Sequence, residues 1–346
     1  MDAIIFGGGV AKGAFSAGAI SVLASAGLRV RRVVGTSSGA LNAAFYARAI
    51  RSGTEDAAGE ELARIWLEEA TLAKGFNVSA KGLLDLEGIS TSDKVLGLLR
   101  RHVRPSAGRE PVDVRLVTTN SAGESGPLEP GRRGTTFEHV LRYGGSALDD
   151  KEGLEALFEG VAASAAFPLA FLPFPLHVGG RSVPCLDGGL TNNTPIKYAI
   201  ENTPDIDRVF VIVPYPALLD SAPELRGFAL VEHLVEVLVQ ERLYRDLREA
   251  YAVNATLARL EVEVPDRSVR AAVLRTLGWS ERRRLQIVEI RPSAPLEGGP
   301  FDGFLSRRLR AEYVAQGQDV ARAWLRDRRR PVDRSLSPTA SVGGAQ

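Results

Sequence analysis

Short apolar segments alternate with longer helical patterns along this chain, and this alternation restricts its fold more than any other feature. Five segments are typical of strands: Ala3–Phe6, Arg32–Val34, Asp113–Thr118, Arg208–Val213 and Gln286–Ile290. Apolar spacing predicts helices over Phe15–Ala26, Ala40–Arg51, Glu55–Ala73, Ser92–His102, Leu225–Leu260 and Ser306–Arg326. Because parallel strands need crossover connections that are usually helical, the pattern predicts an α/β fold with a mostly parallel central sheet.

The segments outside these strands and helices predict edge strands of the sheet and a C-terminal tail. None of them is typical of a linker between two domains. Thr135–Val140 and Arg181–Leu186 are typical of antiparallel edge strands, and the turn-forming residues of segment 120–134 predict a surface loop. No shift in composition divides the chain, so we predict a single domain over residues 1–326. Residues 327–346 lack the apolar content to build a core, which predicts a disordered tail.

The charge and the cysteine content argue against a nucleic-acid-binding protein and against a protein stabilised by disulfides. The chain has 43 Lys and Arg residues against 42 Asp and Glu residues, a formal charge of +1, so nothing predicts binding to nucleic acid. The single cysteine, Cys185, cannot form an internal disulfide; we interpret it as a core residue of a protein in a reducing compartment. Asp2 and the glycines that follow interrupt any secretory signal pattern, so a cytoplasmic location is expected.

The longest apolar segment, residues 161–180, does not predict a transmembrane helix. It contains three prolines, and only about 16 apolar or small residues precede His177, fewer than the roughly 20 that a spanning helix needs. It is interpreted as a buried turn of the core or as the wall of an apolar pocket. Any membrane contact is expected to be superficial, to use apolar residues around the pocket mouth and to be insensitive to salt.

A glycine-rich turn, "GGGVAKG", connects the first strand to the first helix. A dinucleotide-binding fingerprint fails at Lys12, and a P-loop fails at Ala14. Glycines still let backbone N–H groups converge on one point, where the N-terminus of the next helix adds positive potential. The turn therefore predicts an anion site without a cofactor; a tight turn that binds nothing is the alternative.

The second strand ends in "GTSSG", which matches the G-x-S-x-G pattern of a nucleophile elbow. Small residues at Gly35 and Gly39 permit a strained turn that lifts the central Ser37 clear of the sheet. An ordinary Gly/Ser turn is the alternative. Because this elbow would lie beside the glycine turn of the neighbouring strand, the amides of that turn are candidates for an oxyanion hole.

Ser37 needs a base, and the four histidines do not supply an obvious one. None of the four lies in a loop typical of a catalytic base. The segment "DGGLTNNTP" is the stronger candidate because Asp187 ends a strand and two glycines then turn the chain sharply. Seen alone, Asp-Gly-Gly is also a common turn sequence.

Together these motifs resemble the patatin-like phospholipases. "GGGVAKG", "GTSSG", "SAAFP" at Ser164–Pro168 and "DGGLTNNTP" occur in the order of that family. The resemblance implies a three-layer α/β/α sandwich and a serine acyl hydrolase that acts on lipid esters, with Ser37 as nucleophile and Asp187 as base. It implies an oxyanion hole at Gly8 and Gly9, and Lys12 stands where the family has Arg or Lys. The expected supporting residues are Gly7, Lys12, Gly13, Gly35, Gly39, Gly188, Gly189 and Asn193.

A Ser–Asp dyad carries a chemical difficulty. A carboxylate with an ordinary pKa of about 3.9 is a weak base toward an alcohol, so the site must desolvate it. The apolar segment 167–176 is a candidate for the dry wall and for an acyl-chain groove. The mechanism needs no metal or organic cofactor.

Two other functions compete with this hypothesis. One is an α/β-hydrolase esterase with a Ser-Asp-His triad, for which His233 is the one histidine that follows Asp187. The other is an acyltransferase or a non-catalytic lipid-binding protein on the same scaffold.

Overall fold

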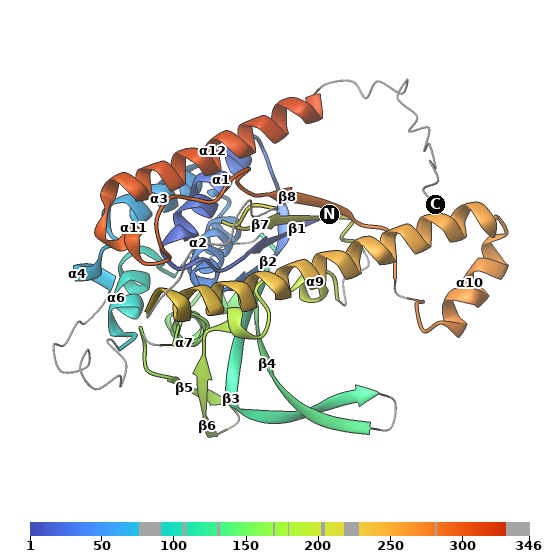
Figure 1. Ribbon diagram of the computed structural model, residues 1–346, viewed down its shortest axis with the longest axis horizontal. Coiled ribbons are helices and arrows are strands. Elements are labelled where there is room, and N and C mark those ends of the chain that lie inside the picture. Colours follow the sequence, from blue (N-terminus) through green and yellow to red (C-terminus); the bar gives the residue numbers. More distant parts are fainter. Residues whose placement is uncertain are drawn as a thin grey trace, which may run out of the picture.

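A mixed eight-stranded sheet runs through the centre of the molecule (Figure 1). The computed structural model describes residues 1–75, 91–105, 108, 110–129, 132–168, 170–178, 180–201, 205–217, 228–280 and 282–329. The strands are β1 (Asp2–Phe6), β2 (Val30–Thr36), β3 (Asp113–Glu129), β4 (Arg132–Gly144), β5 (Phe174–Val178), β6 (Arg181–Leu186), β7 (Arg208–Ile212) and β8 (Gln286–Ile290).

The centre of the sheet is parallel and one side is antiparallel. The strand order is β5-β6-β3-β2-β1-β7-β8, with β4 pairing β3 outside this path. Strands β3, β2, β1, β7 and β8 are parallel to their neighbours in that order. Phe6 at the end of β1 lies opposite Gly35 of β2 and Ile212 of β7. The carboxyl ends of the three central strands therefore meet at one edge, where ligands of open α/β sheets bind.

Helices cover both faces of the sheet. They are α1 (Gly13–Ser25), α2 (Ser38–Ser52), α3 (Glu55–Glu68), α4 (Leu72–Gly75), α6 (Asp93–His102), α7 (Lys151–Ser164), α8 (Ile196–Ile200), α9 (Phe228–Glu263), α10 (Arg267–Thr276), α11 (Asp302–Leu305) and α12 (Arg307–Arg329). Short 3-10 turns are η1 (Val10–Lys12), η2 (Gly145–Leu148) and η3 (Gly188–Leu190).

Strand β1 shows how the layers form. Its side chains alternate, so Ile4 and Phe6 join the large core built with α1, α2, α3 and α12. Ala3 and Ile5 face the other way and join a smaller core with residues of α8 and α9. In Figure 1, α9 crosses one face of the sheet, and α12 and α1 lie on the other side of the sheet. The predicted three-layer α/β/α sandwich is confirmed.

The prediction of a surface loop at 120–134 is wrong. β3 continues to Glu129 and β4 begins at Arg132, so most of this segment forms a long antiparallel hairpin. Cross-strand backbone hydrogen bonds hold turn-forming residues in an extended conformation, and the pairing shifts register around Gly123, whose φ is +72°. Figure 1 shows this hairpin extending away from the helices.

Several other boundaries differ from the predictions. The helix expected over 55–73 ends at Glu68, and α4 forms separately. Helix α12 continues to Arg329, past the expected start of the tail, and residues 330–346 lie outside the described residues. The sequence patterns did not predict α7, β5 or α10.

The end of α9 and all of α10 extend beyond the sheet (Figure 1). We call residues 258–280 and 282–285 the α9–α10 arm. Among the described residues, none between Leu257 and Val288 is buried. The arm therefore packs little against the rest of the protein. Across the described part of the chain, no helix combines the length and the apolar character that crossing a bilayer requires.

Candidate active site

Ser37 occupies a strained turn between β2 and α2. Its φ is 57° and its ψ −132°, a backbone conformation that non-glycine residues rarely adopt. The glycines on either side make the turn sterically feasible. A Cβ at Gly39 would lie 2.0 Å from the carbonyl oxygen of Phe6, and one at Gly35 would lie 2.6 Å from the Cα of Ala40. The strain holds the Ser37 side chain at the carboxyl edge of the sheet.

Asp187 lies between β6 and the η3 turn and contacts Ser37 directly. The Ser37 hydroxyl donates to Oδ2 of Asp187 at 2.6 Å, and the Gly189 amide donates to Oδ1 at 2.8 Å. A Cβ at Gly188 would lie 2.0 Å from the carbonyl oxygen of Val117, so only glycine allows this close approach. The structure therefore brings together two residues that are 150 positions apart in the sequence.

Burial changes the basicity of Asp187. The residue is 3% exposed, and desolvation raises the pKa of its carboxyl to about 7, although the hydrogen bonds from Ser37 and Gly189 lower it. Because it gains a proton near neutral pH, the carboxylate is a far better base than an exposed aspartate. The environment removes the chemical difficulty that an ordinary carboxylate presents.

The glycine turn after β1 lies against Ser37. A Cβ at Gly8 would lie 2.5 Å from the Ser37 Cβ, so the backbone at Gly8 borders Ser37. The Gly8 amide donates to Oδ1 of Asn193 at 2.8 Å, and the Gly9 amide donates to the Ser38 hydroxyl at 3.1 Å. Both amides expected to form the oxyanion hole therefore have side-chain acceptors in this structure.

The other expected supporting residues surround the same edge. The Gly7 amide donates to the Ile212 carbonyl at 3.0 Å, which ties the glycine turn to β7. Lys12 is buried, at 7% exposure. A Cβ at Gly13 would meet the Ser38 hydroxyl and the Trp66 ring at 2.8 Å. These positions hold the glycine turn against the start of α2.

Ser164 contributes to the site in a way that the sequence patterns did not predict. Its hydroxyl accepts the Ser37 amide at 2.9 Å and donates to the Val117 carbonyl at 2.5 Å. It thus joins the elbow to β3 from the C-terminal end of α7. The only signal in the sequence is its place at the start of the "SAAFP" motif.

Comparison with protein families decides the identity of the fold. The model of the family described as patatin-like phospholipase matches residues 4–200, which include Ser37, Asp187 and the glycine turn. This chain belongs to the patatin-like phospholipase family.

Individual relatives of this patatin-like protein are distant. An uncharacterized protein of Bacillus subtilis strain 168, YqhO, is 29% identical over 203 residues, which are 57% of this chain; the chain spans 65% of the length of YqhO. VipD from Legionella pneumophila aligns with a TM-score of 0.40 and 13% identity, covering 94% of this chain and 67% of VipD. A chain from the complex of SpcU with ExoU of Pseudomonas aeruginosa aligns with a TM-score of 0.29 and 15% identity, covering 97% and 72%.

An apolar pocket opens at Ser37 of the patatin-like fold. It holds about 770 Å³ of empty space, including open solvent at its mouth. Its walls come from α2, α3, α6, α11 and the segment after α7. The lining residues are Val10, Ser37, Ser38, Leu41, Ile65, Trp66, Glu69, Ala70, Lys74, Lys94, Val95, Leu98, Ala165, Phe167, Phe171, Phe301 and Phe304. Phe167 and Phe301 stack edge to face with ring centroids 5.6 Å apart, so the C-terminal segment closes the wall that the predicted segment 167–176 begins.

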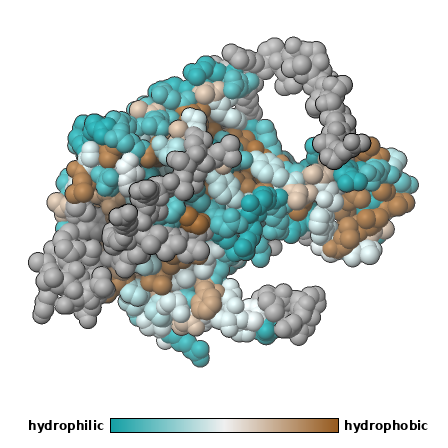
Figure 2. Space-filling view, viewed as in Figure 1, coloured by the Kyte–Doolittle hydropathy of each residue, from teal (hydrophilic) through white to brown (hydrophobic). Residues whose placement is uncertain are grey.

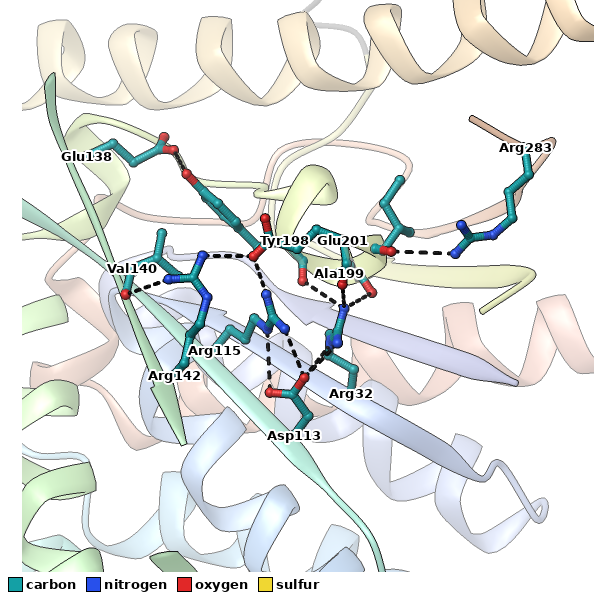
Figure 3. Close-up of polar contacts among 11 residues, drawn as sticks. Arg32, Asp113, Arg115, Glu138, Val140, Arg142, Tyr198, Ala199, Glu201 and Arg283 are labelled. Carbon is teal, nitrogen blue, oxygen red and sulfur yellow. Dashed lines mark hydrogen bonds and ion pairs between the residues drawn. The ribbon is translucent and has the colours of Figure 1, made fainter. Parts of the chain in front are cut away.

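An ionic network anchors the helix that follows the aspartate loop (Figure 3). Nη1 of Arg32 donates to the carbonyls of Glu201 at 2.6 Å and Ala199 at 3.3 Å, at the C-terminal end of α8. Nη2 of Arg32 also pairs with Asp113 at 2.7 Å. Ser37 thus follows the carboxyl end of β2, and Arg32 lies near the other end of the same strand. Through Arg32, β2 also holds α8, the helix that follows the Asp187 loop.

The histidines of the patatin-like chain lie elsewhere. Among the described residues, the hydrogen-bond partners of the Ser37 and Asp187 side chains include no imidazole. His102 packs beside Phe45, His139 faces Glu124, His177 lies on β5 and His233 lies on α9. Cys185 is buried in the core, as the sequence predicts, and burial raises the pKa of its thiol.

Proposed function

We propose that this protein is a serine acyl hydrolase that cleaves carboxylic esters of lipids through a Ser37–Asp187 dyad. The observation that carries the proposal is the 2.6 Å hydrogen bond from the Ser37 hydroxyl to a buried carboxylate whose pKa is raised to about 7. Asp187 takes the hydroxyl proton as Ser37 attacks the ester carbonyl. Asp187 passes this proton to the alcohol oxygen as the ester C–O bond breaks. It then takes a proton from the water that attacks the acyl-enzyme and returns it to the Ser37 oxygen as the carboxylic acid leaves.

The developing oxyanion needs N–H donors beside Ser37. Gly8 borders Ser37, and the next residue, Gly9, lies beside Ser38; their amides donate to neutral side-chain oxygens, of Asn193 and of Ser38 respectively. A negatively charged oxygen is a stronger acceptor than an amide or a hydroxyl oxygen. We therefore assign both amides to the oxyanion hole, with Asn193 and Ser38 as their partners in the absence of substrate.

The apolar pocket supports a fatty acyl group as the substrate portion bound there. Four phenylalanines, a tryptophan and several aliphatic side chains line it, and charged residues are few. An acyl chain gains about 0.8 kcal/mol for each methylene transferred into such a pocket. The head group and the chain length are not part of this proposal.

Two neighbouring serines provide the test. Ser37→Ala is expected to abolish ester hydrolysis and labelling by a fluorophosphonate, whereas Ser38→Ala, one residue along the same turn, keeps both. Purified variants are compared on p-nitrophenyl esters and on phospholipids, with circular dichroism as the check on folding. An inactive Ser38→Ala beside an active Ser37→Ala would refute the assignment of the nucleophile.

A further inference from the structure

The α9–α10 arm presents apolar side chains that nothing in the described part of the chain covers. No residue of α10 is buried. Val262, Val269 and Leu277 are 81%, 51% and 52% exposed. Val269, Val273 and Leu277 recur every four residues, so they share one face of the helix. Figure 2 shows hydrophobic surface gathered at this end of the molecule, on the right.

The same helix is basic. α10 carries Arg267, Arg270 and Arg275 and no acidic residue. The acid nearest to it, Asp266, uses its carboxylate to cap the helix by accepting the amides of Ser268 and Val269. Within the described residues, Arg267 and Arg275 form no ion pair. Around the helix, Arg270 borders the apolar face and Arg267 lies beyond it, whereas Arg275 lies on the opposite side. The glutamates of the arm, Glu261 and Glu263, are paired with Arg284 and Arg259.

We propose that the tip of the α9–α10 arm docks on the surface of an anionic lipid membrane. Shallow insertion of a few apolar side chains, with arginines at the level of anionic head groups, is the binding mode that this combination of residues fits. The arginines complement the charge of that surface. The net charge of the whole protein, +1, conceals this local concentration of positive charge. The proposal therefore departs from the sequence-based expectation of salt-insensitive contact through the pocket mouth.

The size and charge of the surface favour a membrane over another protein. A helix of 10 residues is about 15 Å long, and one such face falls well short of the roughly 1,200 Å² that a specific protein interface buries. A second copy packed symmetrically on α10 would also bring arginines against arginines, with no acid on the helix to receive them.

Vesicle flotation with the full-length Ser37→Ala variant tests the proposal without hydrolysis of the lipid. The variant is expected to bind phosphatidylcholine vesicles that contain phosphatidylglycerol. Binding should be much weaker to vesicles without phosphatidylglycerol and should fall as the salt concentration rises. Val269→Asp with Leu277→Asp should lower the partition coefficient at least about tenfold. Arg267→Gln with Arg270→Gln, the two arginines nearer the apolar face, should lower it roughly 25-fold on anionic vesicles, at about fivefold for each arginine.

Matched controls lie elsewhere on the surface. Phe137→Asp changes a residue that is 48% exposed on β4, and Arg64→Gln with Arg322→Gln removes the same charge from exposed sites. These variants should bind like the parent. The proposal fails if anionic vesicles do not bind, or if the arm and control variants bind equally. It also fails if sedimentation shows a dimer that the Val269→Asp and Leu277→Asp changes abolish, since the face would then contact a second copy. Because Ser37→Ala is used throughout, the result does not depend on the proposed hydrolase activity.

Discussion

At the scale of single residues, the chemistry of the site depends on where one carboxylate is buried. Asp187 stands in a sequence typical of an ordinary turn, yet the turn after β6 places its carboxylate against Ser37 and away from water. Its raised pKa makes the proposed proton transfer from a hydroxyl more favourable.

The raised pKa predicts a specific pH profile. Because the base must be ionised, kcat/KM for ester hydrolysis should fall about tenfold per pH unit below about 7 and level off above it. Initial rates across the pH range on a neutral ester measure this. Full activity maintained to about pH 5 would mean that Asp187 has an ordinary pKa or is not the base.

The raised pKa of Asp187 also makes the free energy of unfolding depend on pH. The folded protein holds the Asp187 proton more tightly than the unfolded chain does, so this group's contribution to the free energy of unfolding falls as pH rises from 3.8 to about 7. Asp187→Asn carries no such charge. Between about pH 4 and pH 7, the free energy of unfolding of the parent should therefore fall relative to that of the variant in chemical denaturation. An identical pH dependence of the two proteins would contradict the raised pKa.

Substitution of the aspartate and of the histidines separates a dyad from a triad. A pKa of about 7 overlaps the range of imidazole, so a pH profile alone does not distinguish them. Asp187→Asn should lower kcat at least about 10⁴-fold, while single Gln variants of His102, His139, His177 and His233 stay near the parent rate. A folded but inactive His233→Gln would instead support the triad.

The sequence indicated both residues of the proposed dyad but not the hydrogen bonds that surround them. Ser37 and Asp187 stand in short motifs whose local geometry is encoded by adjacent glycines. Ser164 supports the elbow through a side chain from another helix, and Asn193 and Ser38 accept the Gly8 and Gly9 amides. Such contacts depend on how distant segments pack, so no local pattern predicts them.

At the scale of elements, two glycines in helices offer a matched comparison. A Cβ at Gly39 of α2 would lie 2.0 Å from the Phe6 carbonyl oxygen, whereas one at Gly97 of α6 would have its nearest contact at 3.7 Å. Gly39→Ala should destabilise the protein by more than about 3 kcal/mol. Gly97→Ala should stabilise it by up to about 1 kcal/mol. Urea unfolding measures both, and equal effects would contradict the close packing of α2 on β1.

The elements that local patterns predicted best are those of the parallel core. The strand predicted over Gln286–Ile290 is observed with the same bounds, because its β-branched residues Ile287, Val288 and Ile290 favour an extended chain. Of the β3–β4 hairpin, the strands over Asp113–Thr118 and Thr135–Val140 were predicted. Its outer part, within residues 120–134, was missed because those turn-forming residues are held in strands by pairing with each other. Helix α10 was also missed, although Val269, Val273 and Leu277 recur at helical spacing and Asp266 caps its first turn.

At the scale of the whole molecule, the pocket depends on segments from across the chain. Phe301 and Phe304 come from beyond the region that the family model matches, and Val95 comes from α6. Val95→Trp should fill part of the pocket and lower kcat/KM for a palmitoyl ester about tenfold or more relative to a butyryl ester. Val178→Trp, on the exposed strand β5, is the control. An unchanged ratio for Val95→Trp would mean that the acyl chain binds elsewhere.

The order of the strands also determines when the site can assemble during synthesis of the chain. β1 lies at the centre of the sheet, but one of its two neighbours, β7, ends at Ile212, and Asp187 follows Ser37 by 150 residues. On the ribosome, the proposed dyad therefore cannot assemble until synthesis has passed Asp187. The moment at which Ser37 first reacts with a fluorophosphonate is expected to mark the completion of this long-range pairing.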